Sequence, residues 1–398
     1  MICKITKKKI KPFMSFGKMP IANGFLKKNQ FKNEFFFNME VGFSKKISLF
    51  QLNNHPKPDQ MFNKNYPFFT GSSKFMILHF KKYSNWVIKK YGKNLKNLIE
   101  IGSNDGTYLS NFDKNKYNVI GFEPSKNVAK ISKQKGIKTV SNFFNFKNAK
   151  KFKNLKNKVD IITAANAICH VPNLISLIKG IEYLLTERGF FIFEEPYLGS
   201  MYEKGSYDQI YDEHIFLFSL TSVNKIFNLF NFELIDGFPQ KTHGGSMRYV
   251  IARKGRYKKT KQLIRLLKNE KVKNIDNLKG CLIFKKKCEN SKKKLVLKIK
   301  KFKERNLTIA GYAATSKSTT ILNYCKIDSN YIDYICDTTK EKIGKYSPGT
   351  HIPIVSIKHF KKNPPDKAFL FAWNHKKEIF KKEKQFTKNG KWFAHVKL

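Results

Sequence analysis

From residue 95 onward, short apolar runs alternate with longer segments in which apolar residues recur at helical spacing. The helical pattern occupies residues 125–135 and 174–185. The apolar runs are short enough for buried strands, and they lie at residues 98–101, 118–123, 159–164 and 189–194. Because strands that alternate with helices form parallel sheets covered on both faces, this part of the chain predicts an α/β, Rossmann-like domain.

The pattern differs at the two ends of the chain and in one internal stretch. Residues 1–80 hold short aromatic patches separated by turn residues, which predicts a small irregular N-terminal domain. Residues 257–305 are rich in lysine and have helical spacing, which predicts one or two connecting helices. Strand–turn–helix patterns then return and predict a second, smaller Rossmann-like α/β domain. The expected divisions are 1–80, 81–250, 251–305 and 306–398.

Composition excludes several classes of protein. With 398 residues and 41% hydrophobic content, the chain is long and apolar enough to bury several cores. No run approaches about 18 consecutive apolar residues, so a membrane-spanning helix is not expected. No apolar stretch follows the basic N-terminal residues, so we expect no secretory signal and a cytoplasmic location. The six cysteines are too scattered for a disulfide scaffold.

The formal charge of +49 raises the question of nucleic-acid binding. Six of the 78 basic residues are arginine, and the lysines are spread along the chain. Because proteins that read base edges favour arginine, we interpret the lysines as solvated surface and expect no specific nucleic-acid partner. A lysine-rich nucleic-acid-binding protein remains the alternative from a different functional class.

A glycine-bearing turn follows the first predicted strand and opens a helix. Gly102 and Gly106 let the backbone turn sharply and approach a ligand closely. Glu123 ends the next strand, where an acid can accept the hydroxyls of a ribose. The turn lacks the Gly-Lys-Ser/Thr of a P-loop and the spacing of G-x-G-x-x-G. Together these residues predict the S-adenosylmethionine site of a class I methyltransferase; a plain tight turn is the alternative.

Eight blocks in the same order carry a resemblance to a known family. The chain resembles the S-adenosylmethionine-dependent sugar C-methyltransferases, which methylate nucleotide-linked 4-keto-deoxysugars. The blocks lie at residues 100–109, 121–125, 166–171, 210–214, 243–248, 312–317, 344–354 and 373–374. The resemblance implies a central methyltransferase domain between a small zinc-binding domain and a C-terminal substrate-binding domain. It places the cofactor at Glu100, Gly102, Asn104, Gly106, Glu123 and Asn166.

The zinc-binding pattern of the family is incomplete in this chain. The family uses two Cys-x-x-Cys pairs, of which Cys3 matches the first position. Thr6, Ser44 and Ile47 stand at the other three. A closed structural zinc site needs about four ligands, so we expect no zinc and no metal site. Aromatic packing would then hold the N-terminal domain together.

The resemblance also implies that His214 is the general base. Methylation of a carbon beside a ketone requires removal of an α-proton and stabilisation of the resulting enolate. Imidazole, with an ordinary pKa of about 6.5, suits that proton transfer. Glu213 and Tyr211 are expected to orient the substrate or the imidazole, and Asp212 replaces a histidine common in relatives. Tyr211 or His170 is the candidate donor to the enolate oxygen, and the sequence does not choose between them.

Three more residues are candidates for binding the substrate. Tyr66 matches an aromatic block that closes over the sugar in relatives, with core packing as its alternative. Lys317 lies where a helix begins and is a candidate contact for the diphosphate. Arg248 could reach a phosphate or form a structural ion pair. The expected partner is a nucleotide sugar, and the expected assembly is a monomer or a small homo-oligomer. An O- or N-methyltransferase of the same fold remains an alternative.

Overall fold

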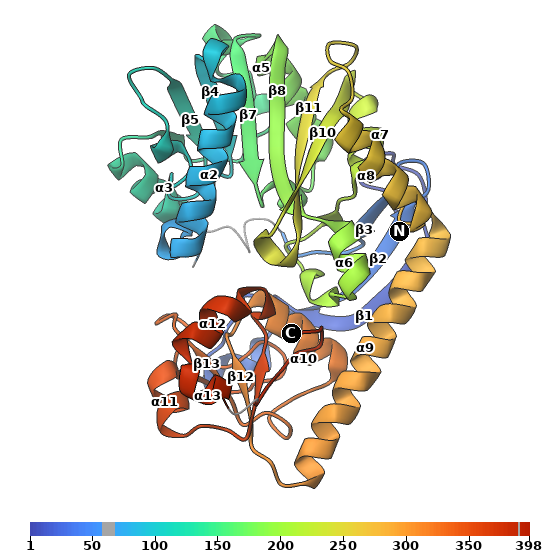
Figure 1. Cartoon of the computed structure of the whole chain (residues 1–398), viewed down its shortest axis with the longest axis vertical. Helices are drawn as coiled ribbons and strands as arrows, with labels where there is room; N and C mark the ends of the chain where they lie inside the picture. Colours follow the sequence, from blue (N-terminus) through green and yellow to red (C-terminus); the bar gives the residue numbers. More distant parts are fainter. Residues whose placement is uncertain (58–67, 389–390) are drawn as a thin grey trace.

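The central sheet confirms the predicted α/β, Rossmann-like domain. The computed structural model describes residues 1–57, 68–388 and 391–398. Seven strands follow the order β10-β11-β8-β7-β4-β5-β6, with β4 to β8 parallel and β11 antiparallel to both neighbours (Figure 1). The bounds are β4 Asn97–Ile101, β5 Asn118–Phe122, β6 Lys138–Val140, β7 Val159–Ala165, β8 Leu185–Pro196, β10 Phe232–Gln240 and β11 Ser246–Arg253.

Alternate residues of the central strands feed two hydrophobic cores. In β8, Phe191 and Phe193 enter one core, while Ile192 enters the core on the opposite face. Helix α5 covers the first face with Leu177 and Ile181. The helices around this sheet are α2 Lys74–Tyr91, α3 Lys126–Gln134, α4 Phe146–Ala149, α5 Leu174–Leu184, α6 Leu198–Lys204 and α7 Leu220–Asn228. The predicted helices at 125–135 and 174–185 are therefore confirmed.

The expectation of irregular structure over residues 1–80 is wrong for the segment from 12 to 52. Strands β1 Pro12–Pro20, β2 Phe36–Ser44 and β3 Leu49–Leu52 form an antiparallel sheet with β9 Phe216–Leu217. The pairing of β1 with β2 shifts register twice, which interrupts the strict alternation by which a strand is recognised in sequence. Phe13, Phe43 and Phe50 pack in its core, so aromatic packing does support this domain.

The C-terminal part is a second α/β unit, as predicted. Its five parallel strands follow the order β14-β13-β12-β15-β16. Their bounds are β12 Ile309–Tyr312, β13 Tyr334–Asp337, β14 Ile354–Ser356, β15 Lys367–Leu370 and β16 Trp392–Phe393. The helices are α10 Ser316–Cys325, α11 Ile357–Lys362, α12 Lys376–Lys382 and α13 Lys384–Lys388. The four domain boundaries themselves stay a prediction.

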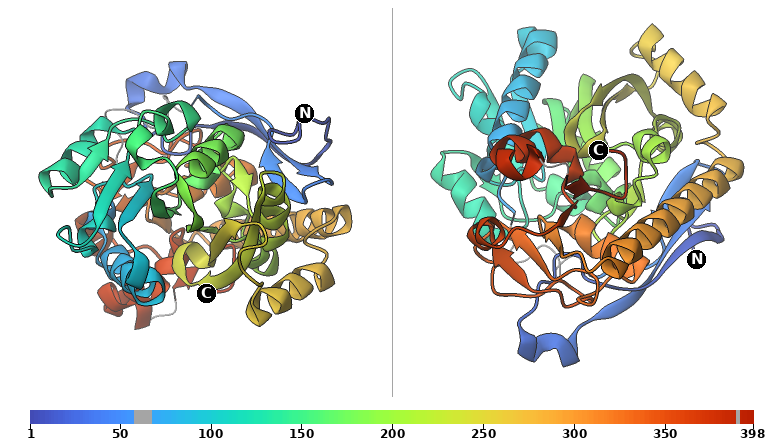
Figure 2. Two further views of the ribbon diagram at one scale, coloured as in Figure 1. Left: turned by 90° about the horizontal axis from the view of Figure 1, so that it is seen from above. Right: turned by 60° about the horizontal axis from the view of Figure 1, so that its bottom comes forward.

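Two connecting helices join the α/β units, as the lysine-rich stretch predicted. They are α8 Lys261–Val272 and α9 Leu278–Glu304. Helix α9 runs past the N-terminal sheet to the C-terminal unit (Figures 1 and 2). One hydrophobic core contains Phe13 from β1, Phe284 from α9 and Phe369 from β15. The N-terminal sheet thus packs against the C-terminal unit, and it also pairs with β9 of the methyltransferase unit.

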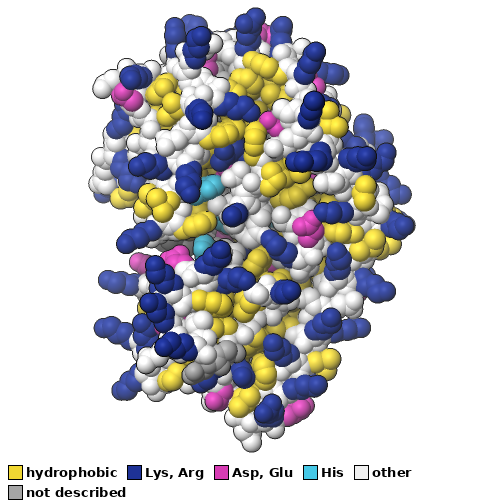
Figure 3. All heavy atoms as spheres, viewed as in Figure 1, with side chains coloured by type: hydrophobic (Ala, Val, Ile, Leu, Met, Phe, Trp, Pro, Cys, Tyr) yellow, Lys and Arg dark blue, Asp and Glu magenta, His cyan; other side chains and the backbone are white. Residues whose placement is uncertain are grey.

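The distribution of surface charge and the apolarity of the helices are relevant to the expectations about nucleic acid and membranes. Figure 3 shows lysine and arginine spread over the visible face, interspersed with apolar and a few acidic side chains. In the part of the chain that the structure describes, no helix has the length and apolarity needed to cross a membrane. All six cysteines are buried and unpaired.

Candidate active site

The loop after β4 has the geometry that its glycines predict. Gly102 has a φ of +70°, and a Cβ built there would lie 2.5 Å from the Cβ of Ala167. Gly106 has a φ of +75°, and its Cβ would lie 2.7 Å from the Oγ of Ser132. Both positions therefore require glycine for two reasons, namely the left-handed backbone and the close approach of neighbouring elements.

Glu123 follows β5 and faces this loop. It is 5% exposed, and its two oxygens accept hydrogen bonds from the backbone N–H groups of Asn104 (3.1 Å) and Ser125 (2.7 Å). Burial raises the pKa of Glu123, while these hydrogen bonds act in the opposite direction. The carboxylate thus lies directly beside the turn, as a ribose-binding acid must.

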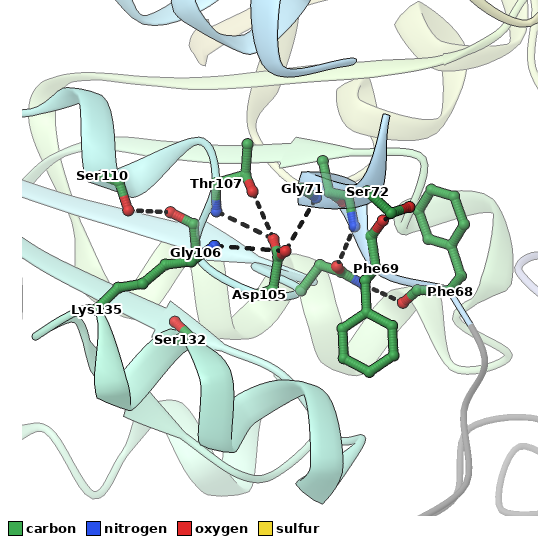
Figure 4. Close-up of polar contacts among 12 residues, drawn as sticks. Phe68, Phe69, Gly71, Ser72, Asp105, Gly106, Thr107, Ser110, Ser132 and Lys135 are labelled. Carbon is green, nitrogen blue, oxygen red and sulfur yellow. Dashed lines mark hydrogen bonds and ion pairs between the residues drawn. The ribbon is translucent and has the colours of Figure 1, made fainter. Parts of the chain in front are cut away.

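The same loop is fastened to the segment that precedes α2. The Oδ1 of Asn104 accepts from the N–H of Thr70 at 2.8 Å, and its Nδ2 donates to the carbonyl of Phe68. Asp105 accepts from the N–H of Gly71 at 2.9 Å and from the hydroxyl of Thr107 at 2.6 Å (Figure 4). These hydrogen bonds fix Asn104, whose φ of +49° is uncommon for a residue with a side chain.

Unpartnered polar atoms around the loop fit a polar cofactor. Among the described residues, buried oxygens without a hydrogen-bond partner include Glu100 Oε2, Ser103 Oγ, Ser125 Oγ and Asn166 Oδ1. Such atoms are rare in proteins unless a ligand or water satisfies them. Burial, reinforced by Asp105 and Glu123, raises the pKa of Glu100 well above its ordinary value. This shift favours the protonated form of the Glu100 carboxyl.

His170 and His214 lie side by side, with ring centroids 5.3 Å apart. The Nδ1 of His214 is 2.7 Å from the carbonyl oxygen of Gln209, and the Nδ1 of His170 is 2.6 Å from that of Glu213. Because a carbonyl oxygen only accepts, each Nδ1 must carry the hydrogen. In the neutral rings, each Nε2 then has the lone pair that a base uses.

The surroundings of His214 disfavour its charged form. Burial holds the pKa of His214 well below its ordinary value, and His170, His243 and Lys317 add repulsion to the charged form. The hydrogen bond to Gln209 acts in the opposite direction. These interactions favour the neutral imidazole, the form in which Nε2 has a lone pair.

The residues around His214 connect it to the N-terminal sheet. The ring of Tyr211 lies 4.0 Å from that of His214, centroid to centroid. Glu213 accepts from the Nδ2 of Asn23 at 2.7 Å, and Asp212 accepts from the N–H of Ala22 at 3.2 Å. Burial, reinforced by Glu213, raises the pKa of Asp212 well above its ordinary value. The segment after β1 thus holds the two acids next to the proposed base.

The substrate candidates have different placements. Lys317 is 9% exposed, donates to the Oδ1 of Asn374 at 3.1 Å and lies 5.5 Å from the centre of the Trp373 ring. Its charge also acts on His214 and lowers the pKa of that histidine. Arg248 is buried against Glu194 at 2.6 Å, which favours the ion-pair alternative. Tyr66 lies outside the described residues.

Sequence reasoning missed several residues near this site. His243 has a φ of +51° and a buried Nε2 without a partner among the described residues. Trp373 packs against Gly244, where a Cβ would lie 2.3 Å from the ring, and donates to Asp208. His243 and Trp373 stood in blocks that carried the family resemblance, so position in those blocks was the available signal. For Asp208 the sequence offered none.

His243 gives a prediction about stability. Burial and the charges of Lys317 and His375 lower the pKa of His243 to about 3. The unfolded chain therefore binds a proton that the folded chain does not, and stability falls as the pH drops from about 6.5 toward 3. Asparagine tolerates the left-handed backbone, so His243→Asn should fold. In denaturant titrations below pH 6.5, the variant should lose about 1.4 kcal/mol less per pH unit than the wild type. Equal slopes would contradict the assignment.

The residues at the family's zinc positions do not fit a zinc ion. Cys3 is fully buried, and its Sγ accepts from the N–H of Thr6 at 3.4 Å. Side-chain hydrogen bonds from Thr6 and Ser44 act on the same thiol, and Ile47 shares its hydrophobic core. One thiolate and two hydroxyls do not make a closed zinc site. We therefore assign no zinc ion to these residues.

The sheet order, the glycine turn and the acid after β5 define a class I methyltransferase. Family models match three successive parts of the chain: a putative zinc binding domain at residues 3–62, a methyltransferase domain at 80–236 and a C-methyltransferase C-terminal domain at 241–396. Together these matches support an S-adenosylmethionine-dependent C-methyltransferase. The match at residues 3–62 does not support the expectation that zinc is absent, which stays a prediction from the residues present.

Similar proteins cover different shares of the chain. The C-methyltransferase NovU of Streptomyces niveus is 26% identical over 380 residues, which are 95% of this chain and 90% of the relative. A solved structure from Pyrococcus horikoshii OT3 is 14% identical with a TM-score of 0.37, covering 47% of this chain and 95% of that chain. Magnesium protoporphyrin IX methyltransferase of Synechocystis PCC 6803 with bound SAM is 13% identical with a TM-score of 0.34, covering 44% and 79%.

Proposed function

We propose that the protein transfers a methyl group from S-adenosylmethionine to a carbon next to the ketone of a nucleotide-activated deoxy-keto-sugar, with His214 as the general base. The observation that carries the proposal is the fixed tautomer of His214, whose Nδ1–H is held by the Gln209 carbonyl. The base then acts through Nε2, beside His170 and Tyr211. The blocks of family resemblance, which occur in the same order along the chain, support a nucleotide-linked keto-sugar as the substrate.

One group of residues would bind the cofactor, and a second group would remove the proton from the substrate. Glu123, Glu100 and Asn166 would bind S-adenosylmethionine, which supplies an electrophilic methyl group when bound. His214 Nε2 takes the α-proton, and the electron pair of the broken C–H bond moves into the enolate. A donor at the enolate oxygen lowers the barrier, since charge develops there. Tyr211 and His170 both lie close enough to His214 for that task.

The cofactor site is tested by calorimetric titration with S-adenosylhomocysteine. The wild type should bind it, and Glu123→Ala should bind much more weakly because the carboxylate beside the turn is gone. Glu289→Ala is the matched control, since Glu289 is half-exposed on α9 and pairs with Lys285. Equal affinity of Glu123→Ala and wild type would remove Glu123 from the site.

The reaction is tested with a panel of nucleotide-linked 4-keto-deoxysugars in D2O. With S-adenosylhomocysteine bound, methyl transfer cannot occur, but the proposed base should still exchange the α-proton for deuterium. Exchange at one carbon, followed by methylation of that carbon with S-adenosylmethionine, is the expected result. Methylation of an oxygen or nitrogen without any α-exchange would overturn the proposal in favour of the alternative methyltransferase.

A further inference from the structure

The segment that holds His214 in place is itself held by the C-terminal unit. A short 3-10 helix at Tyr207–Gln209 is almost fully buried between the two α/β units. Gln209, its last residue, supplies the carbonyl that accepts from His214 Nδ1. The side-chain Nε2 of Gln209 donates to the carbonyl of His243. Any shift of this short helix therefore moves the acceptor that sets the tautomer of His214.

Asp208 connects this helix to the C-terminal unit through two donors. Its Oδ1 accepts from the Nε2 of His395 at 3.0 Å, and its Oδ2 accepts from the Nε1 of Trp373 at 2.8 Å. The side chains of Asp208 and His395 are both fully buried. Burial alone would raise the pKa of Asp208, but His395, Lys317 and the Trp373 N–H hold it below its ordinary value. Asp208 is therefore a charged acceptor that fixes both donors.

Two further hydrogen bonds connect residues 207–210 to α10. The hydroxyl of Tyr207 lies 3.2 Å from the Sγ of Cys325, and the hydroxyl of Thr320 donates to the carbonyl of Ile210 at 2.9 Å. Residues 207, 208 and 210 are thus each bonded to the C-terminal unit, on both sides of Gln209. The position of the Gln209 carbonyl is therefore dictated by the C-terminal unit, although the acceptor of His214 Nδ1 itself belongs to the methyltransferase unit.

We propose that Asp208 and His395 are positioning residues, through which the docked C-terminal unit fixes the Gln209 carbonyl and hence the reactive tautomer of His214. This inference rests on the proposed role of His214 as the base. It makes the C-terminal unit part of the proton-transfer machinery in addition to any role in substrate binding. Without the Asp208–His395 bond, the Gln209 carbonyl loses one of its anchors and the His214 ring samples both tautomers.

The tautomer can be measured on the whole protein without any substrate. Long-range 1H–15N correlation spectra of 15N-histidine-labelled protein distinguish the two neutral tautomers, and the His214 signals are assigned by their loss in His214→Gln. His395→Leu should shift His214 from the Nδ1–H form toward a mixture. His395→Gln keeps a donor near the position of Nε2 and should retain the wild-type tautomer. His359→Leu is the matched control, because His359 lies exposed on α11.

Kinetics give the second readout. His395→Leu should lower kcat by on the order of 100-fold, as expected for a small displacement of a reacting group, with KM for S-adenosylmethionine unchanged. If His395→Leu does not fold, Trp373→Phe removes the other donor to Asp208 and should give the same tautomer shift. An unchanged His214 tautomer in the folded variant would overturn the inference. The role of His214 as the base fails separately, if His214→Gln retains α-proton exchange.

Discussion

His214→Ala is expected to lower the rate of methyl transfer by on the order of 10²- to 10⁴-fold, the usual contribution of a positioned acid or base. His214 combines an Nδ1 held by a carbonyl with a ring that lies 4.0 Å from that of Tyr211, centroid to centroid, and His170 shares the first property. The affinity for S-adenosylhomocysteine should stay unchanged, because the proposed cofactor contacts come from the loop after β4 and from Glu123. Initial rates and calorimetric titration measure the two quantities.

The control for this experiment is the exchange of the α-proton. His214→Ala should lose deuterium exchange and methyl transfer together, because both need the same proton removed. His170→Asn should retain part of the exchange if His170 acts at the enolate oxygen instead. A His214→Ala enzyme with nearly normal transfer would show that the reaction needs no base at this position.

Arg248→Ala is expected to destabilise the folded protein by about 3–5 kcal/mol, the usual cost of removing one partner of a buried ion pair. Glu194 is 1% exposed and contacts Arg248 through both Nη2 (2.6 Å) and Nε (2.7 Å). The guanidinium also stacks 3.8 Å from the centre of the Tyr83 ring. Alanine removes the charge and the packing together. Urea unfolding at pH 7 measures the loss.

A second variant separates charge from packing in that pair. Arg248→Met with Glu194→Gln removes both charges and keeps most of the volume, so it should recover much of the lost stability. His79, whose Nε2 lies 2.6 Å from Glu194, retains an acceptor in the amide oxygen of the new side chain. A loss below about 1 kcal/mol in Arg248→Ala, within the range of exposed ion pairs, would show that Glu194 does not depend on Arg248.

The parts of the fold that sequence predicted are those with local patterns. Gly102 and Gly106 are recognisable because a sharp turn needs them whatever surrounds it. Strands such as 159–165 are buried on both faces and therefore appear as continuous apolar runs. By contrast, β1 contains Gly17, two register shifts and exposed lysine, so nothing local distinguishes it from a loop. Its burial comes from α9 and α10, which follow it by more than 250 residues.

The candidate site also contains residues that a local pattern reveals and residues that only the fold brings together. His214 and Glu123 were found because a motif or a strand end marks them. Asp208 and His395 are 187 residues apart in sequence, and each is an ordinary polar residue until the chain brings them together. Arg248 left two interpretations open, because a lone arginine after a turn suits a phosphate as well as a carboxylate. Only the position of Glu194 on the adjacent strand separates them.

The core shared by β1, α9 and β15 also sets the order in which the protein can assemble during synthesis. Phe13 and Phe369 belong to one cluster, so the N-terminal strands lack most of their apolar neighbours until the ribosome has made the last third of the chain. At about 5–20 residues per second, that wait is roughly 20–70 s. The exposed aromatic strands would be open to aggregation meanwhile, which makes the early chain a natural client of molecular chaperones.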